Sequence, residues 1–99
     1  MVIIELVQQL ESASGDILGS LRMLEGLDKQ RFTDLIGVVD RCAKQFEDRK
    51  ELPKEIGGIF FDIYPAIVSA SYLYPKEITA QIQEAAEKLA DHIRSVFCT

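Results

Sequence analysis

The stretch from Ile56 to Tyr74 constrains the fold most, because Asp62 is its only charged residue. It has the length of a transmembrane helix, since a bilayer needs about 17–25 apolar residues. A helix that is apolar on every side is buried either in a bundle or in a membrane. Several features favour the bundle: Gly57, Gly58, Pro65, Ser69, Ser71 and Asp62 within the stretch, and lysines flanking both ends alike at Lys54 and Lys76. We expect Gly57 and Gly58 to allow close packing against a neighbouring helix.

Pro65 interrupts this predicted helix. It lacks the N–H that would bond to the carbonyl of Phe61, so a kink or a break is expected near it. Asp62 lies three residues earlier, and three interpretations stay open. It faces a hydrated seam or caps a break at the kink, it is a functional carboxylate in an apolar setting, or it pairs with a basic residue such as Arg22 or Arg41.

The rest of the chain shows apolar residues at the three-four spacing of helices, and no segment reads as a strand. Gly26 is predicted to end the first helix in a left-handed conformation, and Asp28 to cap the second. Whether the first helix is continuous through Ser14 and Gly15 stays open. The predicted helices span about 2–25, 28–47, 53–73 and 75–97, with a loop near 48–52. The fold class is therefore all-α: one domain over 1–99, an antiparallel up-down four-helix bundle whose third helix is central and kinked or broken near Pro65.

Charge and cysteine usage exclude some partners. The net charge is −5, which argues against nucleic-acid binding because that needs a basic face. The N-terminus MVIIELV lacks the basic leader of a signal peptide, so a cytoplasmic location, with peripheral membrane contact allowed, is expected. Cys42 falls on an apolar helical stripe and is interpreted as a buried thiol, and Cys98 lies beside the C-terminus.

Catalytic and metal-binding patterns are sparse. The only histidine, His92, precedes Ser95 by three residues near the end of the last helix, which favours a surface pair over a catalytic dyad. Glu84, Glu87 and Asp91 share one side of that helix, a spacing similar to the magnesium-binding carboxylates of all-α nucleotide pyrophosphohydrolases. The matching second acidic cluster is absent. The sequence therefore predicts no enzyme activity, no catalytic or metal residue and no cofactor, and a magnesium-dependent hydrolase is kept as a third hypothesis.

The aromatic residues of the third helix exceed what one buried stripe needs. Three residues suffice for that stripe: Phe60, Tyr64 and Ile67. Phe61, Tyr72 and Tyr74 are then left for another face, and an exposed aromatic face usually marks a partner surface. The alternative is that three neighbouring helices cover the third helix completely.

Four segments together resemble the immunity proteins of pediocin-like (class IIa) bacteriocins. They are Phe32-Thr33-Asp34-Leu35 opening an amphipathic helix, a charged loop to Leu52-Pro53, an apolar third helix, and Tyr74-Pro75-Lys76-Glu77-Ile78 opening the fourth. The resemblance implies a cytoplasmic four-helix bundle that protects a bacteriocin producer. Such a protein binds, from the inner side of the membrane, the complex of bacteriocin and its sugar-phosphotransferase receptor.

The expected partner is therefore a protein, without nucleic acid and without a transmembrane span. The predicted partner-binding residues are Phe61, Tyr72, Tyr74, Lys76 and Glu77. The alternative function is a self-associating or adaptor bundle that uses the aromatic face, which leaves a homodimer open.

Overall fold

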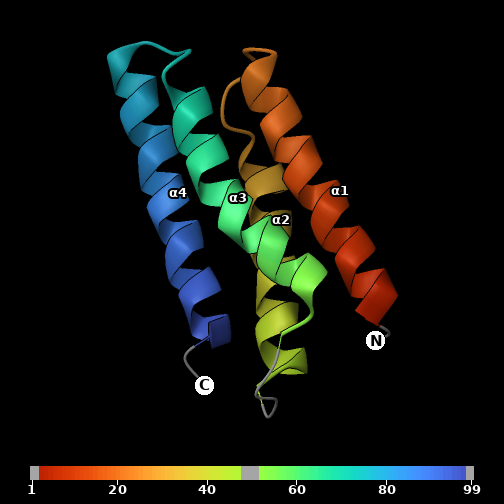
Figure 1. The fold of residues 1–99 in the computed structure, drawn as a ribbon. Helices are drawn as coiled ribbons and strands as arrows, with labels where there is room; N and C mark the ends of the chain where they lie inside the picture. Colours follow the sequence, from red (N-terminus) through yellow and green to blue (C-terminus); the bar gives the residue numbers. More distant parts are fainter. Residues whose placement is uncertain (1–2, 48–51, 98–99) are drawn as a thin grey trace.

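The computed structural model describes residues 3–47 and 52–97. These residues form four helices, α1 (Ile3–Arg22), α2 (Lys29–Gln45), α3 (Lys54–Ser71) and α4 (Lys76–Phe97), and contain no strand (Figure 1). The all-α, four-helix prediction is confirmed. No helix within the described ranges is long and apolar enough to cross a membrane. The predicted loop near 48–52 lies outside the described residues except for Leu52, and Cys98 lies outside them as well.

Each helix turns one apolar stripe inward, and the four stripes form a single core. The largest fully buried side chains come from all four helices: Leu6, Leu10, Ile17, Leu21, Leu35, Val39, Ile56, Ile67, Ile82 and Leu89. Cys42 is also fully buried, as expected. Burial raises the pKa of its thiol to about 11, although the neighbouring charge of Arg41 acts in the opposite direction.

The helices pack in the ring order α1, α2, α4, α3 (Figure 1). α1 packs against α2 and α3, and α4 packs against the same two helices. Within the described residues no Cα atom of α2 lies within 8 Å of one in α3, and the same holds for α1 and α4. The prediction that α3 is central is therefore wrong, since it has two neighbours like every other helix. Its apolar composition reflects an outer face on which Phe61 and Pro65 are exposed and Asp62 is the one charged side chain between Glu55 and the end of the helix.

Polar side chains connect neighbouring helices near the surface. The pairs are Arg31 with Ser20 and Arg41 with Gln9 between α1 and α2, His92 with Asp40 between α2 and α4, and Tyr64 with Glu87 between α3 and α4. These pairs contribute to the axial register between the helices that they join.

Two helices are continuous where the sequence left a break open. α1 runs through Ser14 and Gly15, and α3 runs through Pro65, so neither helix is interrupted. A bend at Pro65 stays a prediction. A Cβ added to Gly57 or Gly58 would meet nothing within 4 Å. The expectation that these glycines allow close helix packing is therefore wrong, because no neighbour approaches them.

Candidate functional site

Five large apolar side chains are exposed at the end of the bundle where α1 leads into α2 and α3 leads into α4. They are Met23, Leu24, Tyr72, Leu73 and Ile78, and between 37% and 75% of each is exposed. We call this set the tip. Large exposed apolar patches are uncommon on monomeric proteins and mark interaction sites when they occur.

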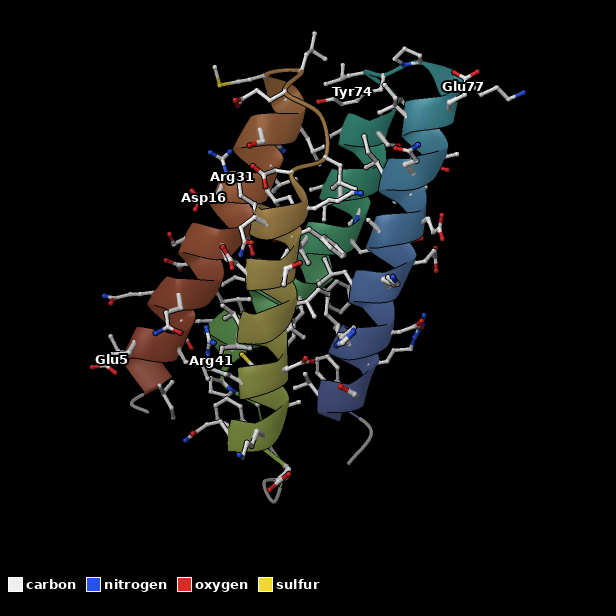
Figure 2. The ribbon with its side chains drawn as sticks, turned by 180° about the vertical axis from the view of Figure 1, so that it is seen from behind. Glu5, Asp16, Arg31, Arg41, Tyr74 and Glu77 are labelled. Atoms are coloured by element: carbon white, nitrogen blue, oxygen red, sulfur yellow. The ribbon has the colours of Figure 1, made fainter. Side chains whose placement is uncertain are left out.

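The hydroxyl of Tyr74 holds the two connections of the tip together (Figure 2). It donates a hydrogen bond of 2.7 Å to the carbonyl of Leu21, at the end of α1. It also accepts one of 3.0 Å from the backbone N–H of Gly26, in the loop that follows. The side chain is half-buried, unlike its exposed neighbour Tyr72. One phenol therefore positions both connections against each other.

Leu24 adopts a backbone conformation that leucine rarely takes. Its φ is +60°, and its N–H bonds to the carbonyl of Leu21 while the N–H of Glu25 bonds to that of Ser20. This bonding is the Schellman motif, whose left-handed position usually holds glycine. The prediction that Gly26 ends the helix is wrong: α1 ends at Arg22 and Leu24 is the left-handed residue. Gly26, with φ of +84°, is a second left-handed residue within the loop.

Thr79 fixes the other connection. Its hydroxyl donates to the carbonyl of Ser71 at 2.7 Å and lies 2.9 Å from that of Tyr74. The backbone N–H of Thr79 donates to the carbonyl of Pro75, the residue directly before α4. The side chains of Lys76 and Glu77 are exposed beside this turn, and Figure 2 shows Glu77 at the start of α4.

The structure gathers four of the five predicted partner-binding residues near this end and places the fifth elsewhere. Tyr72, Lys76 and Glu77 are exposed there, whereas Tyr74 is turned inward to connect the loops. Phe61 is 85% exposed, but it lies on the outer face of α3, about three turns from Tyr72. Met23 and Leu24 were missed, because the helical spacing of the first segment assigned them to its last turn.

The acidic residues on α4 do not form a metal site. Glu87 accepts a hydrogen bond from the hydroxyl of Tyr64, and Asp91 pairs with Arg94 at 3.1 Å. The bond to Glu87 raises the pKa of Tyr64, because it favours the protonated phenol. Over residues 3–47 and 52–97, no group of three or more His, Cys, Asp or Glu side chains is placed to hold a metal ion.

His92 and Ser95 do not form a catalytic pair. The Nδ1 atom of His92 lies 2.7 Å from an oxygen of Asp40, and the Ser95 hydroxyl donates to the backbone carbonyl of His92 rather than to its ring. Both contacts are at the surface. The arrangement connects α4 to α2 and provides no positioned nucleophile.

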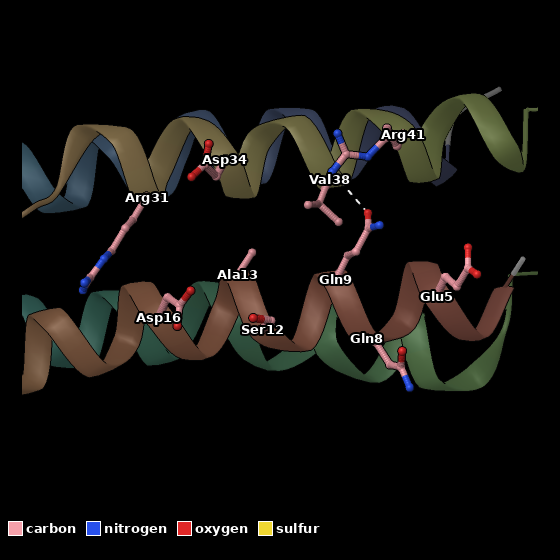
Figure 3. Close-up of a pocket in the computed structure, with 10 residues that line it drawn as sticks. All are labelled: Glu5, Gln8, Gln9, Ser12, Ala13, Asp16, Arg31, Asp34, Val38 and Arg41. Carbon is pink, nitrogen blue, oxygen red and sulfur yellow. Dashed lines mark hydrogen bonds between the residues drawn. The ribbon is translucent and has the colours of Figure 1, made fainter. Parts of the chain in front are cut away.

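A polar groove of about 450 Å³ runs between α1 and α2 (Figure 3). Arg31 and Arg41 extend from α2 towards α1, and Asp16 and Glu5 lie on α1 (Figure 3). Arg41 is bonded to Gln9, and Arg31 contacts Ser20 and pairs with Asp28 at 3.7 Å. Because both arginines have partners and charges of both signs alternate, this groove is a polar seam between two helices rather than an anion site.

Comparison with models of known protein families, with curated proteins and with solved structures gives no match to this chain.

Proposed function

We propose that this chain is a non-enzymatic helical binding protein whose tip docks onto a protein partner. The observation that carries the proposal is the tip itself, which exposes five large apolar side chains on or beside the two connections that Tyr74 holds together. Leu24 adds to it, since a leucine with positive φ costs free energy that an exposed side chain does not recover by packing within the chain. Strained residues of this kind cluster at functional sites.

The chemistry of the tip favours a protein surface with an apolar centre. Aromatic and methionine side chains are enriched in protein interfaces, and Met23 and Tyr72 are the most exposed members of the tip. Lys76 and Glu77 carry opposite charges beside it, as expected for a polar rim that adds specificity. A rigid tip also loses little conformational entropy on binding.

The sharpest form of the proposal is bacteriocin immunity. The support is the resemblance of the chain to pediocin-like immunity proteins, which includes the turn from Tyr74 to Ile78 that lies at the tip. In this form the protein acts in the cytoplasm and binds the membrane receptor complex of a bacteriocin. The proposal includes an antiparallel up-down path of the chain and a bend of α3 at Pro65.

Expression in a bacteriocin-sensitive host tests this form. The wild-type chain should raise tolerance to at least one pediocin-like peptide, and Leu73→Glu should abolish the effect by placing a charge in the apolar tip. Ile4→Glu is the matched control, since it makes the same kind of change at a residue with 67% exposure outside the tip. Unchanged killing across a panel of such peptides by cells that accumulate the wild-type protein would remove immunity from consideration.

Self-association through α3 is the second candidate, and the exposure of Phe61 favours it. The outer face of α3 around Phe61 and Pro65 carries one charged side chain, Asp62, between Glu55 and the end of the helix. Light scattering on the eluting protein should then report a dimer that Phe61→Ser converts to a monomer. A monomer at all accessible concentrations contradicts this candidate and leaves the tip proposal intact.

A further inference from the structure

A second surface, separate from the tip, lies in the groove between α1 and α3. The groove has a volume of about 330 Å³ and an apolar floor formed by Leu18, Ile59 and Ile63. α1 and α3 lie side by side along it (Figure 1). Its lips carry charged residues from both helices, so the groove combines an apolar floor with a polar rim.

The groove contains a buried polar group that this chain leaves unsatisfied. Ser14 lines the groove and is only 7% exposed. Its hydroxyl is buried and has no hydrogen-bond partner among the described residues. A buried hydroxyl without a partner costs free energy, and such groups are uncommon in folded proteins. Ser14 therefore adds an unsatisfied polar group to the wall of the groove.

The charges of the rim are separated along the groove. Glu11 on α1 and Asp62 on α3 are both exposed, and neither has a side-chain hydrogen bond or an ion pair in the described part of the chain. Arg22 lies on the same side of α1 as Glu11, about 16 Å further along the helix axis. The groove thus presents two carboxylates and, about three turns later along α1, a cation.

A glycine lies one turn from each of the two exposed carboxylates of the groove. Gly15 follows Glu11 by one turn on α1, and Gly58 precedes Asp62 by one turn on α3. A Cβ added at either position would meet nothing within 4 Å, so packing within this chain does not require glycine at either position. Glycine is destabilising inside a helix relative to alanine, and it permits the close approach of another backbone.

We propose that this groove binds an amphipathic helix of a partner protein, aligned antiparallel to α1. The small apolar face of this helix lies on Leu18, Ile59 and Ile63. An acidic residue in its first turn meets Arg22, and a basic residue about three turns later meets Glu11 and Asp62. This order of charges also stabilises the bound helix itself, because acidic residues favour a helix N-terminus and basic residues favour the C-terminus.

Two synthetic helical peptides of about 18 residues test the proposal. Both carry an alanine, leucine and serine face, labelled with a fluorophore. The first has Glu in its first turn and Lys about eleven residues later, which spans about 16 Å. The second has the two charges exchanged. Fluorescence anisotropy with the full chain should show the first peptide binding at least about tenfold more tightly. The double variant Glu11→Lys/Arg22→Glu should reverse this preference.

A glycine variant separates docking from effects on folding. Gly15→Gln adds a side chain one turn from Glu11, beside the groove, and should weaken binding of the first peptide at least about tenfold. Gly57→Gln is the matched control, since a Cβ at Gly57 also meets nothing within 4 Å, but Gly57 lies two turns before Tyr64, on the side of α3 that faces α4. Equal affinity of the two peptides, or equal effects of the two glycine variants, overturns the proposal. So does a dimer that Gly15→Gln dissociates, because the occupant would then be a second copy.

Discussion

At the residue scale, Leu24 combines an exposed side chain with a left-handed backbone. The left-handed conformation costs about 1–2 kcal/mol for a residue with a Cβ, and 63% exposure means that little core packing offsets this cost. Leu24→Gly should therefore raise the free energy of unfolding by about 1 kcal/mol, after the larger unfolded-state entropy of glycine is subtracted. Urea denaturation measures the change.

If the Leu24 side chain contacts the partner, Leu24→Gly should bind the partner more weakly than the wild-type chain, although its folded state is more stable. Leu24→Asn is a useful control, because asparagine tolerates positive φ and removes the apolar side chain without adding the flexibility of glycine. A loss of stability in both variants would show that the Leu24 side chain contributes to folding.

The buried thiol of Cys42 should make the free energy of unfolding fall at alkaline pH. Its pKa is raised from 9.0 to about 11 by burial, so the folded state holds the thiol proton more tightly than the unfolded state does. The contribution is fully present below pH 9, falls between pH 9 and pH 11, and is lost above that range, because the unfolded chain then ionises first. Across this window the free energy of unfolding should fall by about 2–3 kcal/mol more than in Cys42→Ala. Urea titrations of both proteins at several pH values, in a Cys98→Ser background, make the comparison, and identical pH profiles would contradict it.

At the element scale, the sequence predicted the four helices because each carries its own apolar stripe at helical spacing. The Asp28 cap was also predictable, since a short polar side chain before a helix bonds to an early N–H, here that of Arg31 at 3.0 Å. The end of α1 was not predictable, because glycine is the usual left-handed residue and Gly26 lies close by. The role of Tyr74 was missed for another reason: its partners, Leu21 and Gly26, are distant in the sequence.

The two hydrogen bonds of the Tyr74 hydroxyl should contribute measurably to the free energy of unfolding. Tyr74→Phe removes the hydroxyl that bonds to Leu21 and Gly26, and two such bonds contribute about 1–3 kcal/mol together. The amide of Gly26 should also exchange with deuterium faster in this variant. Tyr72→Phe is the control, because Tyr72 is 72% exposed and surface changes of this kind usually stay within about 0.5 kcal/mol. Equal losses in the two variants would mean that the hydroxyl of Tyr74 does not hold the loops.

At the scale of the whole molecule, the ring order could not be read from the sequence. Periodicity shows which face of each helix is buried, but it does not show which helix covers that face. Short connections suggest that consecutive helices are neighbours, and this holds for α1 with α2 and for α3 with α4. It fails for α2 and α3, which lie diagonal to each other. The central position predicted for α3 had another source, its nearly uncharged sequence, whereas the exposure of Phe61 agrees with its predicted place on a second face.

Spin-label distances test the ring order, because the two orders that keep α1 beside α2 and α3 beside α4 give opposite results. Labels at Lys44 and Ser95 report on α2 and α4, and labels at Lys44 and Phe61 report on α2 and α3. All these positions are exposed, and the native cysteines are replaced by Ala at 42 and Ser at 98. Neighbouring helix axes lie about 8–10 Å apart, so a diagonal pair lies about 11–14 Å apart before the labels extend outward. The Lys44–Ser95 distance should therefore be several ångströms shorter than Lys44–Phe61. A bundle in which α2 contacted α3 and lay diagonal to α4 would reverse the order of the two distances, and it would also cover part of α3 that this structure leaves exposed.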